Sequence, residues 1–233
     1  MAPEGSRRYL FGIDSADRFA RMVGGRPASW TLDVACAAMS GAFTGVDRTD
    51  EVLARLDALA DSCTEPTLAG VLGAMRGRLT GNVQDYYDAR NSFIDHVLER
   101  GVGLPITLGV IAIEVGRRVG APVVGIGPPR HFMVRHPTAQ QYGDPFHDGA
   151  LYDRAGLQAV WPQLVGEQTP FDDVHLVPMA ERGILIRMLN NLRTIYVARN
   201  DVVRLHPLVK MRSAFVELLG EAPDWARWVA IWN

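Results

Sequence analysis

The chain has 233 residues, of which 48% are hydrophobic, so it is long and apolar enough to bury a full core. Its net charge is −2 and its charged residues form no long runs, which excludes a strongly charged surface for nucleic acid or membrane. All of its 24 basic residues except Lys210 are arginine, and they are scattered along the chain, which indicates genome composition and not phosphate binding.

The sequence has no stretch patterned as a signal peptide and no apolar run long enough to span a bilayer, which predicts a cytoplasmic protein. The two cysteines, Cys36 and Cys63, are too few for a disulfide framework and belong to no metal-binding motif. Both are expected to be reduced thiols, and no cofactor is expected.

Residues 1–85 are predicted to form a helical N-terminal part. Phe11 and Phe19 are expected to dock a first short helix. Apolar residues then recur at helical spacing over residues 31–42 and again over residues 51–61. A third helix, interrupted by glycines, is predicted at residues 67–75, and these helices are interpreted as a scaffold.

The middle of the chain begins with a helix at residues 93–100, for which Asn91 and Ser92 are expected to supply the N-cap. Pro105 suits the first position of the next helix, because its missing N–H would have no partner there. The apolar stripe of this helix continues to Gly120, which predicts a central and well-buried helix.

Strands follow at residues 131–136 and 142–146, an order that predicts an antiparallel meander. Helices at residues 184–199 and 208–219 are predicted to form an α-hairpin. Three tryptophans then share one helical face and are expected to pack on the body or, if uncovered, to promote a homodimer: Trp225, Trp228 and Trp232.

Five linked motifs resemble the bacterial SirB-type branch of the transglutaminase-like superfamily. They are YYDARNSF at residues 86–93, VLER at 97–100, GLPITL at 103–108, HFMVR at 131–135 and DPF at 144–146. Several motifs in the right order over about sixty residues make a strong family signal.

The resemblance implies an α+β fold in one domain, residues 1–233, with a papain-like or transglutaminase-like core at residues 86–180. In that core a central helix packs against a small antiparallel sheet. Residues 181–233 would be a C-terminal helical hairpin, a truncated form of the tetratricopeptide-like helices that often end the family. The superfamily's thiolate sits in the first turn of the central helix, but the branch generally lacks it.

Here that first turn offers only Pro105, Ile106 and Thr107. The resemblance makes His131 and Asp144 the candidate catalytic residues, because an imidazole oriented by a carboxylate acts as a general base or acid near neutral pH. The two side chains are expected within hydrogen-bond reach on adjacent strands. The alternative is a hydrogen bond that only braces the two strands.

Five further residues are candidates for substrate binding: Thr107, Arg130, His147, Asn91 and Glu99. Three of them have a structural alternative, since Thr107 and Asn91 would cap helices and Glu99 would form an ion pair at a helix end. A metal site from His131, Asp144 and His147 is disfavoured, because the sequence has no helical His-x-x-x-His pair.

Two classes of function remain open. The favoured one is a cysteine-independent enzyme that uses the His131–Asp144 dyad on a small-molecule biosynthetic substrate, in a cyclisation, elimination or acyl-type reaction. The polar residues Arg130, His147 and Asp148 near the expected cleft support it. The other is a non-catalytic binding or regulatory protein that recognises a protein partner.

Overall fold

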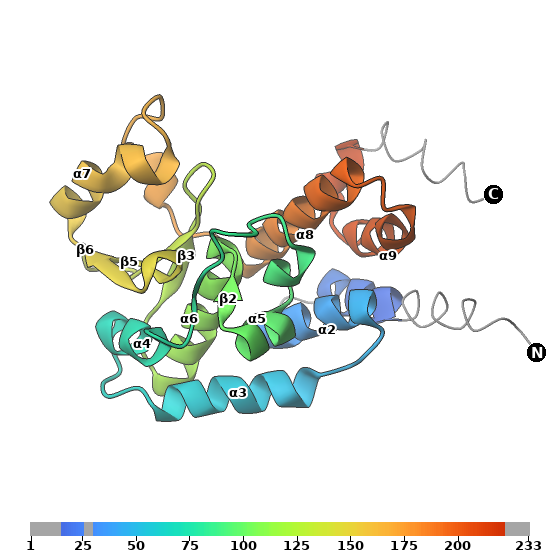
Figure 1. The fold of residues 1–233 in the computed structure, drawn as a ribbon, viewed down its shortest axis with the longest axis horizontal. Helices are drawn as coiled ribbons and strands as arrows, with labels where there is room; N and C mark the ends of the chain where they lie inside the picture. Colours follow the sequence, from blue (N-terminus) through green and yellow to red (C-terminus); the bar gives the residue numbers. More distant parts are fainter. Residues whose placement is uncertain (1–14, 26–29, 222–233) are drawn as a thin grey trace, which may run out of the picture. The chain divides into compact units, whose positions relative to one another are not determined.

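A computed structural model describes residues 15–25 and 30–221 (Figure 1). Phe11, which was expected to dock the first helix, lies outside the described residues. The three tryptophans expected on one helical face also lie outside them: Trp225, Trp228 and Trp232. The chain divides into two compact units, Met1–Thr49 with Leu185–Asn233, and Asp50–Ile184. The sequence predicted one domain, with residues 50–85 grouped with the N-terminal helices instead of the core.

The first unit is helical. It contains a helix at residues 15–24, α2 (Leu32–Thr44), most of α8 (Glu181–Ala198), α9 (Val202–Arg212) and the short η5 (Val216–Glu221). Cys36 is fully buried on α2, and its Sγ lies 3.7 Å from Sδ of Met188. Helix α9 begins six residues before its predicted start at residue 208, because the Asp201 side chain caps it by accepting a hydrogen bond from the Arg204 N–H.

The second unit begins with the helices α3 (Thr49–Asp61) and α4 (Leu68–Met75). Two short strands, β1 (Thr80–Gly81) and β2 (Val102–Gly103), pair in parallel. Between them lie η2 (Ala89–Ser92) and α5 (Ile94–Arg100).

The main sheet has four antiparallel strands in the order β3 (Val124–Ile126), β4 (Met133–Arg135), β5 (Tyr142–Asp144) and β6 (Ala150–Tyr152). The predicted meander is therefore confirmed, although its strands are shorter than predicted. Strand β6 and the helix that follows it, α7 (Arg154–Val165), were not predicted.

Helix α6 (Pro105–Val119) packs against β3, β4 and the short helix η3 (Pro145–His147). It begins at Pro105 and ends at Gly120, whose φ of 74° is the left-handed C-cap, both as predicted. Its Gly109 lets it approach the sheet closely, because a Cβ at that position would overlap the ring of Phe132. This packing confirms a central helix against a small antiparallel sheet.

Helix α7 contributes to a separate apolar cluster on the other face of the sheet. Successive strand residues point to opposite faces, so Met133 is directed away from the α6 side on which Phe132 packs. Met133 and Tyr142 lie in one cluster with Leu157 and Trp161 of α7. No described helix has the length and apolar character that crossing a bilayer requires.

Candidate active site

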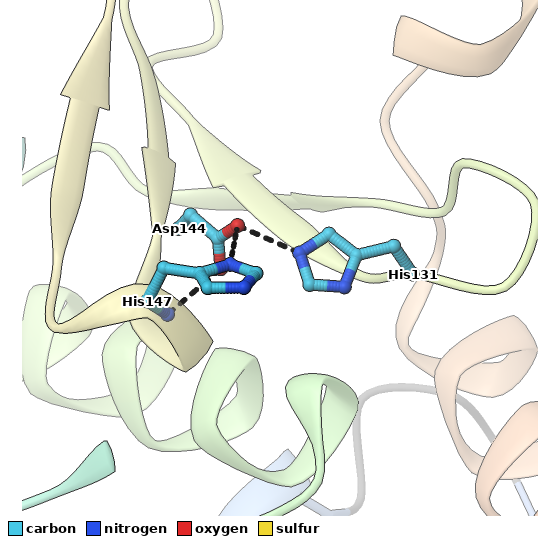
Figure 2. A group of neighbouring side chains, drawn as sticks. All are labelled: His131, Asp144 and His147. Atoms are coloured by element: carbon cyan, nitrogen blue, oxygen red, sulfur yellow. Dashed lines mark hydrogen bonds and ion pairs between the residues drawn. The ribbon is translucent and has the colours of Figure 1, made fainter. Parts of the chain in front are cut away.

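The end of the main sheet brings three polar side chains together (Figure 2). His131 lies two residues before β4, Asp144 ends β5, and His147 ends η3. His131 Nε2 lies 2.7 Å from Asp144 Oδ2, and His147 Nδ1 lies 2.8 Å from the same oxygen. The predicted proximity of His131 and Asp144 is confirmed, with His147 as a second imidazole on the same carboxylate.

The local sequence explains how Asp144 is oriented. Asp144 is the N-cap of η3, Pro145 begins that helix, and the second carboxylate oxygen, Oδ1, accepts hydrogen bonds from the main-chain N–H groups of Phe146 and His147 at 3.0 and 3.4 Å. A 3₁₀ helix has about three residues per turn, so the side chain three positions after Asp144 returns to the same side. This turn places the His147 ring on the carboxylate.

The three side chains differ in exposure. The side chain of Asp144 is fully buried, that of His131 is 5% exposed and that of His147 is 49% exposed. Burial raises the pKa of Asp144, but hydrogen bonds from His131 and His147 outweigh this effect and lower the pKa to about 2. Asp144 is therefore a buried carboxylate at neutral pH. Its hydrogen bond to the His147 ring in turn raises the pKa of His147.

Phe146 holds the two imidazole rings in place. Its ring meets His131 edge-on, with centroids 5.9 Å apart, and meets His147 in the same way at 5.2 Å. The Phe146 ring packs directly against Gly81, and only a residue without a side chain fits there, because an added Cβ would lie 2.5–2.6 Å from the ring. Packing as well as hydrogen bonding thus fixes the orientation of His131.

Comparison with known proteins agrees with this architecture. The sequence model of the transglutaminase-like superfamily matches residues 47–190. The chain belongs to the transglutaminase-like superfamily. Its α+β fold, with α6 against the antiparallel sheet, is consistent with that membership.

The chain is similar to proteins of bacteria and of animals. A UPF0162 protein of Xylella fastidiosa is 43% identical over 128 residues, 52% of this chain and 45% of that protein. A UPF0162 protein of Vibrio cholerae is 36% identical over 121 residues, 49% of this chain and 43% of that protein. Human F-box only protein 21 is 34% identical over 58 residues, 25% of this chain and 9% of that protein.

The chain thus spans less than half the length of the bacterial relatives that it matches. No solved structure matches it.

The first turn of α6 in this superfamily member contains Pro105, Ile106 and Thr107. Thr107 is fully buried, and its Oγ1 has no hydrogen-bond partner among the described residues. The N-cap residue of α6 is Leu104, and Thr107 Oγ1 accepts no hydrogen bond from the first turn, so the capping role expected of Thr107 is wrong.

Cys63 lies after α3, where its Sγ is 3.1 Å from the carbonyl oxygen of Glu65.

The capping role predicted for Asn91 is also wrong. Asn91 belongs to η2, and its fully buried amide donates to the carbonyl oxygens of Asp85 and Tyr86 and accepts from Asn82 and Arg100. These bonds join residues five to nine positions apart and tie η2 to the loop before it and to the end of α5, which the spacing of caps along one helix did not reveal. The amide therefore has a structural role in this unit.

Arg130 and Glu99 are exposed side chains. Arg130 precedes His131 and has a left-handed backbone, with a φ of 63°. Substrate binding by these two residues stays a prediction. His147 was predicted as a substrate ligand, and its bond to Asp144 could have been recognised from the Asp-Pro helix start and the three-residue spacing.

Proposed function

We propose that this chain is a cysteine-independent enzyme of the SirB-type branch, in which His131 transfers a proton on a small-molecule biosynthetic substrate. The observation that carries the proposal is the 2.7 Å bond between His131 Nε2 and the buried carboxylate of Asp144. The proposal also places the enzyme in the cytoplasm, without a nucleic-acid or membrane partner.

The proposal gives each ring nitrogen of His131 its own role. In the tautomer that donates Nε2–H to Asp144, Nδ1 carries the lone pair, and the proposal makes Nδ1 the atom that takes the substrate proton. The imidazolium that forms is stabilised by Asp144, whose pKa of about 2 keeps it charged throughout. His131 then returns the proton to the leaving group of an elimination, or to the atom that closing a ring has made basic.

Such proton transfer typically contributes ~10²–10⁴ in rate, and it requires no covalent intermediate on the protein. This suits the position where the superfamily has its thiolate, since the first turn of α6 contains Pro105, Ile106 and Thr107. Cys36 is fully buried on α2, in the other unit. In an acyl-type reaction the nucleophile would have to come from the substrate itself.

The alternative is a non-catalytic binding or regulatory protein. It is favoured by the 5% exposure of His131 and by the four hydrogen bonds that Asp144 accepts, because both suit a brace between β4, β5 and η3. A brace would need the same geometry, and the two functions are therefore separated by turnover.

The test incubates purified protein with a bacterial small-molecule extract in the presence of a chelator, and follows every mass feature by liquid chromatography and mass spectrometry. Wild type is expected to consume at least one feature and to form a product. The variants His131→Ala and Asp144→Asn should lower that rate at least a hundredfold. His136→Asn is the matched control, because asparagine can still accept from the Ala139 N–H, which His136 Nδ1 does at 3.0 Å.

Equal consumption by wild type and a folded His131→Ala protein would refute the enzyme. A feature that is retained by the protein without being converted would instead support the binding protein. Circular dichroism on the same preparations shows whether each variant is folded.

A further inference from the structure

The same three side chains have a metal-binding geometry, which is a separate matter from proton transfer. We propose that His131, Asp144 and His147 form a site for a divalent cation of the Zn²⁺ class. Within the described ranges they are the one group of three potential ligands that meets, with one ligand atom from each lying within 4.8 Å of the others. The three residues and their hydrogen bonds are drawn in Figure 2.

The donor set suits such an ion. Two imidazole nitrogens and one carboxylate oxygen are ligands that Zn²⁺ and related cations accept, and three protein ligands leave a fourth position for water. Asp144 supplies a fully buried carboxylate whose Oδ2 lies next to both imidazole rings.

The distances require a small movement. Ligand atoms on a tetrahedral Zn²⁺, each about 2.1 Å from the metal, lie about 3.4 Å apart. The present separations from Asp144 Oδ2 are 2.7 Å to His131 and 2.8 Å to His147, so each must lengthen by about 0.6–0.7 Å. His147 can make this adjustment, because its side chain is 49% exposed.

The carboxylate is already held for coordination. Asp144 Oδ1 accepts from the N–H groups of Phe146 and His147, which leaves Oδ2 directed at both imidazoles. Hydrogen bonds of this kind to a ligand orient it and typically change metal affinity ~10–100-fold. The exposed side of His147 supplies the route by which an ion enters.

The sequence disfavoured metal because it has no helical His-x-x-x-His pair. The structure builds the site differently, from the segment before β4, the end of β5 and the end of η3. Asp144 and His147 are three residues apart across the η3 turn, and His131 is brought in by the pairing of β4 with β5. The spacing that a helix would need therefore does not apply.

The experiment titrates the chelator-treated full chain with Zn²⁺ by isothermal calorimetry and with Co²⁺ by visible absorption. We expect one ion per chain at micromolar or lower concentration, and the intense visible bands of tetrahedral Co²⁺. His147→Ala should weaken Zn²⁺ at least tenfold, and His147→Gln should do the same if the alanine variant folds poorly. His136→Asn should leave the affinity unchanged.

Undiminished affinity in folded His147→Ala and His147→Gln would overturn the proposal, as would the absence of binding at about 100 μM Zn²⁺. The test uses no substrate, and the turnover test above is run with a chelator, so the failure of one leaves the other standing. If both hold, Zn²⁺ should suppress turnover, because the ion displaces the hydrogen bond that orients His131.

Discussion

Asp144→Asn tests the cluster most directly, because asparagine keeps the size of the side chain but loses its charge and one acceptor oxygen. Asp144 accepts four hydrogen bonds, two on each oxygen. The amide has one oxygen, so either the two imidazoles or the two main-chain N–H groups lose their acceptor. The side chain is fully buried, so water cannot replace the lost partner.

The pKa of Asp144 gives the magnitude. Its fall from 3.8 to about 2 corresponds to about 2 kcal/mol of folding free energy, at about 1.4 kcal/mol for each pH unit. Leaving buried donors without an acceptor costs about 1–3 kcal/mol, and this is the same effect counted in another way. Asp144→Asn should therefore lower the free energy of unfolding at pH 7 by about 2 kcal/mol.

The pH dependence has a definite sign. A carboxyl group whose pKa is lowered in the folded state stabilises the protein above its ordinary pKa of 3.8, and this contribution disappears as the pH falls toward 2. The raised pKa of His147 acts in the other direction, with its contribution complete below pH 6.5 and lost as the pH rises through the raised value. The difference between wild type and Asp144→Asn should thus be largest between about pH 4 and pH 6.5 and shrink on both sides.

Urea unfolding followed by circular dichroism at a series of pH values measures this difference. Amide hydrogen exchange in peptides from residues 124–152 reports on the second unit alone. The exposed Asp61→Asn is the control and should change stability by less than about 0.5 kcal/mol. The stabilising role of the hydrogen bonds to Asp144 is refuted if Asp144→Asn is as stable as wild type at pH 7. It is also refuted if the difference in free energy of unfolding between the two proteins does not shrink in acid.

Three further changes follow from the packing. A Cys36→Ser, Cys63→Ser double variant should keep any turnover, and a folded but inactive double variant would contradict a cysteine-independent reaction. In wild type, iodoacetamide should alkylate the partly exposed Cys63 first and the buried Cys36 only on unfolding, which intact-protein mass spectrometry would measure. Gly109→Ala should lose about 1–3 kcal/mol in urea unfolding, because its Cβ would overlap the ring of Phe132, and a gain in stability would refute that close approach. Asn91→Ala should cost about 2 kcal/mol or more, because it leaves the buried partners of the amide unsatisfied, and a melting temperature equal to that of wild type would argue against the network.

Local sequence was sufficient where a single turn decides the structure. Pro105 at the start of α6 and Gly120 after its end define a helix that the structure reproduces. The strand–turn–strand order predicted the meander of β4 and β5. The resemblance to the transglutaminase-like superfamily predicted that His131 and Asp144 meet, and the pairing of β4 with β5 brings the two positions together.

Tertiary structure decided the features that depend on distant partners. Asn91 is a residue type that often caps helices. Its amide oxygen instead accepts hydrogen bonds from the side chains of Asn82 and Arg100, because these donors also need partners once the chain has folded. Strand β6 and helix α7 were missed because their apolar residues, such as Trp161, are explained by the sheet face that they cover and not by a strong local pattern.

The role of His147 shows both limits together. The dipeptide Asp144-Pro145 indicates the start of η3 from the sequence, and the turn of this helix places the side chain of His147 near Asp144. That both imidazoles share one oxygen of a fully buried carboxylate follows only from the strand pairing and from the Phe146 ring packed against Gly81. The local turn sets which side chains can meet, and long-range packing removes the water that would otherwise compete for the charge.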